Sequence, residues 1–281
     1  MAPGDSNDPL LKQVLPTSNE DIKVDNFFLD PVGDHDAIVA EGVLHKYHGR
    51  ALLLTTGACA IHCRYCFRRH FPYAQANASR SDWSAAIDYL QTNEDIHEVI
   101  LSGGDPLTLT DAKLYQLVKK LEKISHINTL RIHTRLPVVL PERVCDDLIA
   151  WLSQSRLKKV IVIHSNHANE IDQDVIDSLA RLKQADVTLL NQAVLLKGIN
   201  DNTGDLVALS NSLFMAGVLP YYLHMLDPVD GAAHFDTTQA KACVLIEEMS
   251  KKLPGYLVPK LVREIAGEMA KMPVSSMKIR E

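Results

Sequence analysis

The segment Ala51-Leu-Leu-Leu-Thr55 is followed, after three further residues, by Cys59-Ala-Ile-His-Cys63-Arg-Tyr-Cys66. The first segment is a short apolar run of the kind that forms a buried strand, and the second brings three cysteines close together. Thiolates are strong ligands for the iron of iron–sulfur clusters, and three of them leave one iron of a four-iron cluster open to a small molecule. The stretch therefore predicts a strand that ends at a metal-binding loop.

A zinc site is the alternative explanation for this loop, with the three cysteines and His62 as ligands. Structural zinc prefers four closed ligands, and His62 lies between two cysteines, where completing a site needs an awkward local bend. The total of five cysteines is odd, which suits a metal site in a reducing compartment better than a set of disulfides. Cys145 and Cys243 are expected to be ordinary buried thiols.

Five further apolar runs rich in β-forming residues follow the first one along the chain. Helix-period segments lie between them, as where Leu114, Leu117 and Leu121 share one face. This alternation predicts an α/β fold of parallel strands, either a closed or partial β/α barrel or an open doubly wound sheet. In each arrangement, ligands collect at the carboxyl ends of the strands. The predicted strands are Ala51–Thr55, His97–Leu101, Thr129–His133, Lys159–Ile163, Val187–Leu190 and Leu219–Leu223.

The two ends of the chain differ in pattern. The first part is rich in Pro, Asp, Asn and Gly without a sustained period, which predicts an irregular or short helical arm over residues 1–45. Residues 46–281 are predicted to form one barrel-type domain, because α/β barrels of this length commonly form a single unit.

Composition excludes several classes of function. With 46% hydrophobic residues, 23% charged residues and a net charge of -6, the chain has no general attraction to nucleic acid. No apolar run approaches the roughly 20 residues that a membrane helix needs, and the start does not read as a signal peptide. We therefore expect a cytoplasmic protein without nucleic-acid or membrane partners.

The spacing Cys-x3-Cys-x2-Cys after the first strand resembles the radical S-adenosylmethionine superfamily, in which that nucleotide chelates the open iron. Further runs narrow the resemblance to the lysine 2,3-aminomutase family, most closely its short bacterial branch that makes (R)-β-lysine for modifying elongation factor P. The resemblance extends from about Asp8 onward and implies a partial (β/α)6 barrel of the radical S-adenosylmethionine type with an irregular N-terminal arm. The runs are Phe67–Phe71, Ser102–Leu107, Asn166–Glu170 and Asn191–Leu196.

The resemblance implies that Cys59, Cys63 and Cys66 ligate a [4Fe–4S] cluster that binds S-adenosylmethionine. The run Ser102-Gly103-Gly104-Asp105 follows the second predicted strand, where glycine lets the backbone approach a ligand closely, although a tight turn alone explains it too. Asp105 and a backbone carbonyl are implied to meet the ammonium group of the nucleotide. Other implied cofactor contacts are Asn166, His167 and Gln192.

A second implied cofactor is pyridoxal 5′-phosphate, held as a Schiff base on Lys271. Lysine is the residue that forms imines with this cofactor, and Gly267 nearby leaves it room. The larger family members have a run of glycines in this loop, whereas this chain has Glu268-Met269-Ala270. Lys46 and Arg50 match a basic pair near the cofactor phosphate, with a solvated basic face as the alternative.

The substrate implied by the resemblance is L-lysine. Arg68 matches the arginine that pairs with the substrate carboxylate, and a planar guanidinium suits bidentate recognition. Asp227 and Glu264 match the two acidic residues that hold the distal ammonium group, although Glu264 replaces the usual aspartate. The implied reaction is the isomerisation of L-α-lysine to (R)-β-lysine, with a reductant such as flavodoxin or ferredoxin and with a ligase for elongation factor P using the product.

Two other functions are weighed against this one. The first is a radical S-adenosylmethionine enzyme that acts on another substrate without pyridoxal phosphate, and the second is a non-catalytic iron–sulfur or zinc-binding protein. His164, His167 and Glu170 resemble a metal-ligand group in composition, but their spacing follows a strand end and not a helical ligand face. We expect them to form part of the active-site wall.

Overall fold

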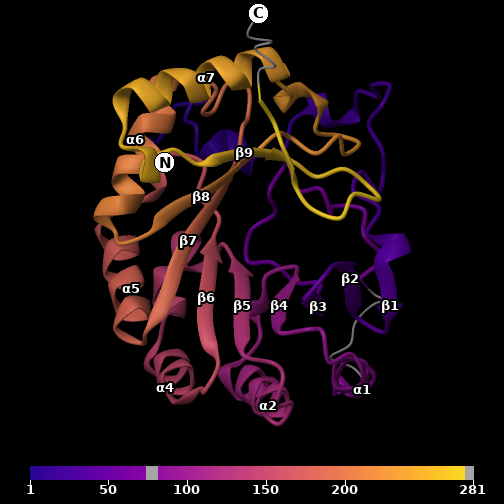
Figure 1. The fold of residues 1–281 in the computed structure, drawn as a ribbon. Helices are drawn as coiled ribbons and strands as arrows, with labels where there is room; N and C mark the ends of the chain where they lie inside the picture. Colours follow the sequence, from indigo (N-terminus) through magenta and orange to yellow (C-terminus); the bar gives the residue numbers. More distant parts are fainter. Residues whose placement is uncertain (74–81, 276–281) are drawn as a thin grey trace, which may run out of the picture.

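The structure, a computed structural model, describes residues 1–73 and 82–275 of the chain. Within these residues, one sheet contains all ten strands, which lie side by side in sequence order (Figure 1). The strands are β1 (Ile38–Ala40), β2 (Val43–Tyr47), β3 (Arg50–Thr56), β4 (Glu98–Gly103), β5 (Thr129–Thr134), β6 (Lys158–Ile163), β7 (Val187–Val194), β8 (Leu219–His224), β9 (Lys260–Arg263) and β10 (Met272–Pro273).

Strands β3 to β9 run parallel, and the strands at either end of the sheet pair antiparallel. In the part of the chain that the structure describes, the sheet has two open ends and does not close. The partial barrel predicted from the sequence is therefore confirmed. The helices cover the outer face of the parallel strands (Figure 1). They are α1 (Ser84–Thr92), α2 (Asp111–Glu122), α3 (Leu136–Val139), α4 (Asp146–Gln154), α5 (Gln173–Gln184), α6 (Thr203–Met215) and α7 (Gln239–Lys252).

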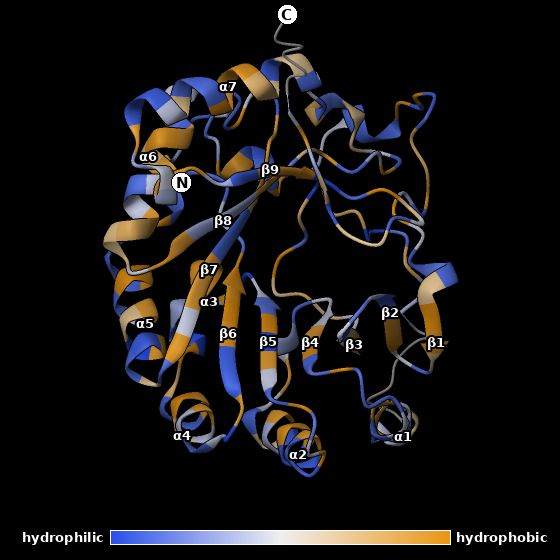
Figure 2. Ribbon diagram, in the orientation of Figure 1, coloured by the Kyte–Doolittle hydropathy of each residue, from blue (hydrophilic) through white to orange (hydrophobic). Residues whose placement is uncertain are grey.

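The core forms where the helices pack on the strands. Leu53, Leu101, Ile132, Ile161 and Leu189 are paired neighbours on consecutive strands, and all are buried in one cluster with the inner faces of the helices. Hydrophobic segments of the helices face the sheet, and hydrophilic ones face outward (Figure 2). Because side chains alternate along a strand, the neighbours of these core residues point to the inside of the half-barrel.

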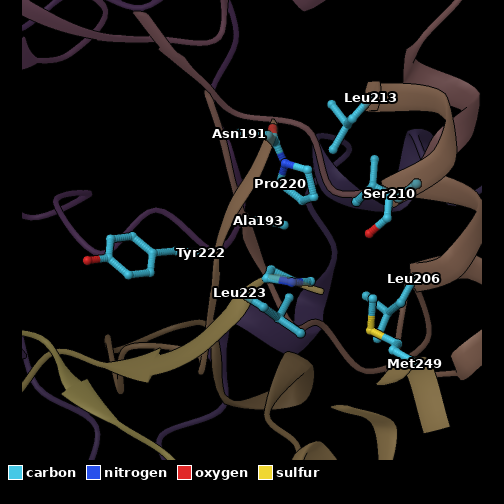
Figure 3. A pocket seen from close by; sticks show the side chains of 11 residues that line it. Asn191, Ala193, Leu206, Ser210, Leu213, Pro220, Tyr222, Leu223 and Met249 are labelled. Atoms are coloured by element: carbon cyan, nitrogen blue, oxygen red, sulfur yellow. The ribbon is translucent and has the colours of Figure 1, made fainter. Parts of the chain in front are cut away.

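Strand β8 shows this alternation directly. Leu223 lies with Leu206 and Met249 from α6 and α7, whereas Tyr222 points away from the helices (Figure 3). The gap between these side chains is only about 10 Å³, no more than the space that one water molecule needs. The outer layer is therefore close-packed, and ligands must bind on the inner side.

The six strands predicted from the sequence correspond to β3 through β8. The structure adds β1, β2, β9 and β10, which were not predicted from the sequence. The predicted arm forms three short 3₁₀ turns before it joins the sheet through β1 and β2, and the division of the chain at residue 45 stays a prediction. Among the described helices, none combines the length and apolarity that crossing a bilayer requires.

Candidate active site

A cavity of about 1120 Å³ opens on the inner side of the half-barrel, at the carboxyl ends of the parallel strands. It exceeds the roughly 300–1,000 Å³ of a pocket for one drug-sized ligand, so it has room for more than one small molecule. All of the predicted site residues except Asn166 and His167 lie on its wall. These wall residues are Lys46, Arg50, Cys59, Cys63, Cys66, Arg68, Ser102, Gly103, Gly104, Asp105, Gln192, Asp227, Glu264 and Lys271.

The cysteine loop leaves β3 at its carboxyl end and is held from outside by the N-terminal arm. Arg64, between two of the cysteines, is buried and donates to the carbonyl of Lys12 at 2.8 Å and to Oγ1 of Thr17 at 2.9 Å, and it forms an ion pair with Glu20. The backbone N–H of Arg64 also donates to the carbonyl of Gln13 at 3.0 Å. The arm therefore fixes the course of the loop.

Two of the three thiols lie where their surroundings oppose ionisation. Burial and the neighbouring cysteines raise the pKa of Cys59 to about 12 and that of Cys66 to about 11. A bound metal cluster supplies the positive charge that ionises such thiols. Across residues 1–73 and 82–275, no group of three His, Cys, Asp or Glu side chains converges as ligands of one ion.

The glycine pair after β4 is required by close packing of the backbone. Gly103 has φ +119°, and a Cβ atom on Gly104 would lie 2.3 Å from the carbonyl oxygen of Ala58 in the cysteine loop. The carbonyl of Gly103 also accepts a hydrogen bond from the Tyr73 hydroxyl at 2.6 Å. Both glycines therefore bring the end of β4 against the cysteine loop, which places their backbone on the cavity wall.

The carboxylate of Asp105 accepts hydrogen bonds from other groups of the protein. Its oxygens accept hydrogen bonds from Oγ1 of Thr134 at 2.6 Å and from the backbone N–H of Arg135 at 2.7 Å, and further ones from Leu107 and Leu136. The side chain thus ties β4 to the end of β5. Its predicted contact with the nucleotide ammonium stays a prediction, and its observed geometry assigns it a positioning role.

Replacing Asp105 by alanine is expected to destabilise the protein by about 2–3 kcal/mol, because it leaves several buried donors without an acceptor. Denaturant unfolding of the apoprotein measures the loss. Asp88→Ala, at an exposed position on α1, is the control and should change stability by less than about 0.5 kcal/mol. An Asp105→Ala protein as stable as the control would contradict the assignment.

A chain of alternating charges crosses the opposite end of the cavity. Nζ of Lys271 lies 2.6 Å from Oε2 of Glu264, and Nζ of Lys46 bridges Glu264 at 3.3 Å and Asp34 at 2.6 Å. Asp34 in turn accepts a hydrogen bond from Nε of Arg68 at 2.6 Å. Burial opposes ionisation of Glu264, but Lys271 and Lys46 hold its pKa at about 2.

The hairpin of β9 and β10 creates the first pair in this chain. Met272 pairs with Arg263, so the residues just beyond them, Glu264 and Lys271, face each other across the hairpin mouth. Asp34 was missed by sequence reasoning, since a lone carboxylate in an irregular arm carries no signal. It is 2% exposed and connects the arm to both basic residues, Lys46 and Arg68.

Asp227 is a carboxylate of the cavity wall that lacks a hydrogen-bond partner on one oxygen. Its Oδ1 atom is buried without a hydrogen-bond partner. Burial and the negative charge of Glu264 raise its pKa to about 7. A buried carboxylate in this state is stabilised by a cation, and the cavity beside it is where a cation can enter.

Three histidines line the inner wall between the two ends, namely His133, His164 and His224. Burial lowers the pKa of all three, that of His164 to about 3, so they are neutral. Nε2 of His164 lies 2.9 Å from Nε2 of Gln192, while Nε2 of His133 and of His224 have no partner. The wall therefore offers neutral hydrogen-bonding groups. His133 and His224 were not predicted as site residues; the only signal in the sequence was that each lies near the end of a predicted strand, at a position that faces inward.

Asn166, His167 and Glu170 lie outside the cavity wall. The Asn166 amide donates to the Tyr65 hydroxyl at 2.6 Å, and Nδ1 of His167 accepts from the backbone of Asn169 at 3.2 Å. Of the residues expected in the wall after β6, only His164 is there. The others build a buried polar frame behind the cysteine loop.

Comparison with known proteins identifies the class to which this half-barrel and cysteine loop belong. The profile of the Radical SAM superfamily matches residues 53–209, a range that contains the three cysteines. Two solved radical S-adenosylmethionine enzymes share the fold. Native anSMEcpe with bound AdoMet and a peptide has a TM-score of 0.53 at 10% identity, over 72% of this chain and 58% of its own. A radical S-adenosylmethionine methyltransferase from Sphaerobacter thermophilus has a TM-score of 0.54 at 14% identity, over 79% of this chain and 68% of its own.

The chain is thus a radical S-adenosylmethionine enzyme, and curated relatives narrow the class. It is 48% identical to the L-lysine 2,3-aminomutase of Escherichia coli (strain K12), over 98% of this chain and 80% of the relative. It is also 48% identical to the L-lysine 2,3-aminomutase of Haemophilus influenzae, over 94% of this chain and 78% of the relative. The enzyme of the same name from Clostridium subterminale is 37% identical, over 97% of this chain and 65% of the relative. The protein belongs to the L-lysine 2,3-aminomutase family, whose members are isomerases, and membership confirms the expected [4Fe–4S] cluster and S-adenosylmethionine.

Proposed function

We propose that this protein converts L-lysine to (R)-β-lysine with pyridoxal phosphate as a further cofactor. The observation that carries the proposal is the pair of carboxylates, Asp227 and Glu264, in one cavity with Lys271 and the cysteine loop. A site with two buried acids at one end selects a substrate with a cationic side chain. The relatives named L-lysine 2,3-aminomutase support the same substrate.

Cys59, Cys63 and Cys66 would hold the cluster, and Lys271 would hold pyridoxal phosphate. When bound, these groups and S-adenosylmethionine supply the one-electron chemistry and the conjugation that an amino-group migration requires. The chain supplies position and protection from water, because the cavity lies inside the half-barrel.

Lys271 must lose a proton before its Nζ can act as a nucleophile. Oε2 of Glu264 lies 2.6 Å from this nitrogen and accepts a hydrogen bond from it. Once Nζ is engaged elsewhere, Oε2 of Glu264 becomes available to a substrate ammonium group. Arg68, at the far end of the charge chain, keeps its orientation through Asp34 and through Oγ of Ser102 at 3.1 Å, so its remaining N–H groups can meet the substrate carboxylate.

Replacing Asp227 by asparagine is expected to raise the KM for L-lysine by roughly 30-fold or more, because an ammonium group loses its buried partner. The same variant should be more stable than the wild type at pH 8, on the order of 4 kcal/mol. The pKa of Asp227 in the folded protein is about 7, above the 3.8 of a free aspartate, so between these two values the folded state binds more protons than the unfolded state and stability falls as the pH rises.

Denaturant midpoints between pH 4 and pH 8 and lysine titrations of turnover check both parts. The stability gain should shrink as the pH is lowered toward 4. Asp36→Asn, at an exposed carboxylate, is the control and should alter neither quantity. An Asp227→Asn protein with unchanged KM would contradict the role in substrate binding.

The experiment that tests the proposed function is anaerobic reconstitution with iron, sulfide and pyridoxal phosphate. The protein is then incubated with L-lysine, S-adenosylmethionine and a reductant, and β-lysine is measured by chromatography. Formation of β-lysine from L-lysine, and no β-glutamate from L-glutamate, is the expected result. Cleavage of S-adenosylmethionine without β-lysine would keep the superfamily and reject the substrate.

We further propose a flavodoxin or ferredoxin as the electron donor, a ligase for elongation factor P as the user of the product, and the cytoplasm as the location. The family resemblance and the composition of the chain support these proposals.

A further inference from the structure

One buried arginine lies directly behind the cysteine loop. Arg135 follows β5, is 8% exposed, and its Nη1 donates to Sγ of Cys63 at 2.8 Å. Nothing in its spacing within the sequence marks it, because it lies 72 residues from that cysteine. A permanently charged donor thus contacts one of the three sulfur atoms from the protein side.

Besides Cys63, two side chains hold the guanidinium in this position. Nη2 donates to Oε2 of Glu170 at 2.9 Å and to Oε1 of Gln13 at 2.8 Å. Glu170 is oriented by backbone N–H groups of Asn166 and His167, at 2.8 and 3.0 Å. The backbone N–H of Arg135 is bound by Asp105, and so the side chain cannot turn away from the loop without breaking a buried network.

The reduction potential of an iron–sulfur cluster depends on net charge and on hydrogen bonds to its sulfur atoms. A reduced cluster carries one more negative charge than an oxidised one. A cationic donor on a ligand sulfur stabilises the reduced form more and raises the potential, whereas a carboxylate beside that donor offsets part of its charge.

We propose that Arg135 is a positioning residue that raises the reduction potential of the cluster through Cys63, and that Glu170 limits this effect. The inference rests on the proposed ligation by Cys59, Cys63 and Cys66. One electron passes from an external low-potential donor to the cluster; no bond forms or breaks at Arg135, which remains protonated throughout.

The test compares the variants Arg135→Gln and Glu170→Gln, each reconstituted with iron and sulfide. The potential is measured without substrate, by titration with dithionite and mediators monitored by electron paramagnetic resonance. We expect a more negative potential for Arg135→Gln and a less negative one for Glu170→Gln. Loss of a merely structural contact would not move the potential in opposite directions in the two variants.

Arg143→Gln is the matched control. Nη1 of Arg143 lies 3.6 Å from Sγ of Cys145, a cysteine outside the triplet, and its guanidinium pairs with a carboxylate, Asp111. This control should leave the potential unchanged. An unchanged potential in Arg135→Gln, or a shift equal to that of the control, would overturn the inference.

Two further readouts separate the possible failures. Wild-type protein without a four-iron signal would refute the ligation itself, whereas a normal signal with unchanged potentials in both variants overturns the role of Arg135 alone. If Arg135→Gln holds no iron, Glu170→Gln decides the question, because it keeps the arginine. A potential in Glu170→Gln that is equal to or below that of the wild type would then overturn the inference.

Discussion

Replacing Lys271 by alanine is expected to abolish both the pyridoxal absorbance and the formation of β-lysine, while the iron content stays at the wild-type level. Lys271 offers its Nζ to the cavity, and alanine cannot bind the cofactor covalently. Its partner Glu264 then loses the closest of the cations that hold its pKa at about 2. Absorbance spectra, iron analysis and product chromatography on the reconstituted variant measure the three quantities.

Lys260→Ala is the control for this experiment, since Lys260 is exposed on β9, the first strand of the same hairpin. It should keep both the absorbance and the turnover. Borohydride reduction followed by peptide mass analysis would locate the cofactor on the peptide that contains Lys271. Turnover retained in Lys271→Ala would reject the assignment of this lysine, although not the superfamily.

Replacing Cys63 by serine is expected to remove iron and keep the pyridoxal absorbance, the reverse of the result expected for Lys271→Ala. Iron content should fall and cleavage of S-adenosylmethionine should drop below detection, because one of three ligands to the cluster is lost. Pyridoxal absorbance should persist, since Lys271 belongs to the hairpin of β9 and β10 and not to the cysteine loop. Iron and sulfide analysis and the yield of 5′-deoxyadenosine check the loss.

Cys145→Ser provides the comparison for that variant. Cys145 is half-buried and donates to Asp111 at 3.3 Å, away from the cavity wall. Wild-type iron content is expected in this variant. If Cys63→Ser kept its iron and cleaved S-adenosylmethionine, the ligand set would have to be sought elsewhere in the chain.

Local patterns in the sequence were sufficient for the central part of the fold. The parallel strands β3 to β8 are apolar runs separated by helices with one buried face, and both patterns are readable over a few residues. Strands β1, β2 and β10 were missed because they join the sheet through antiparallel hairpins and so lie outside the alternation of strands and helices, and β9 was missed as well. The antiparallel pair of β9 and β10 has the largest consequence, since it brings Glu264 to Lys271.

The residues of the site likewise fall into those that the sequence predicts and those that only the tertiary structure brings together. The spacing of Cys59, Cys63 and Cys66 places three thiols on one short loop whatever surrounds it, so the sequence alone determined the superfamily and the place of the cluster. Only the tertiary structure decided which charges meet, because Asp34, Arg135 and Gln13 reach their partners over 34 to 157 residues of chain. Such contacts arise when distant segments pack together, and their geometry leaves no periodic trace in the sequence.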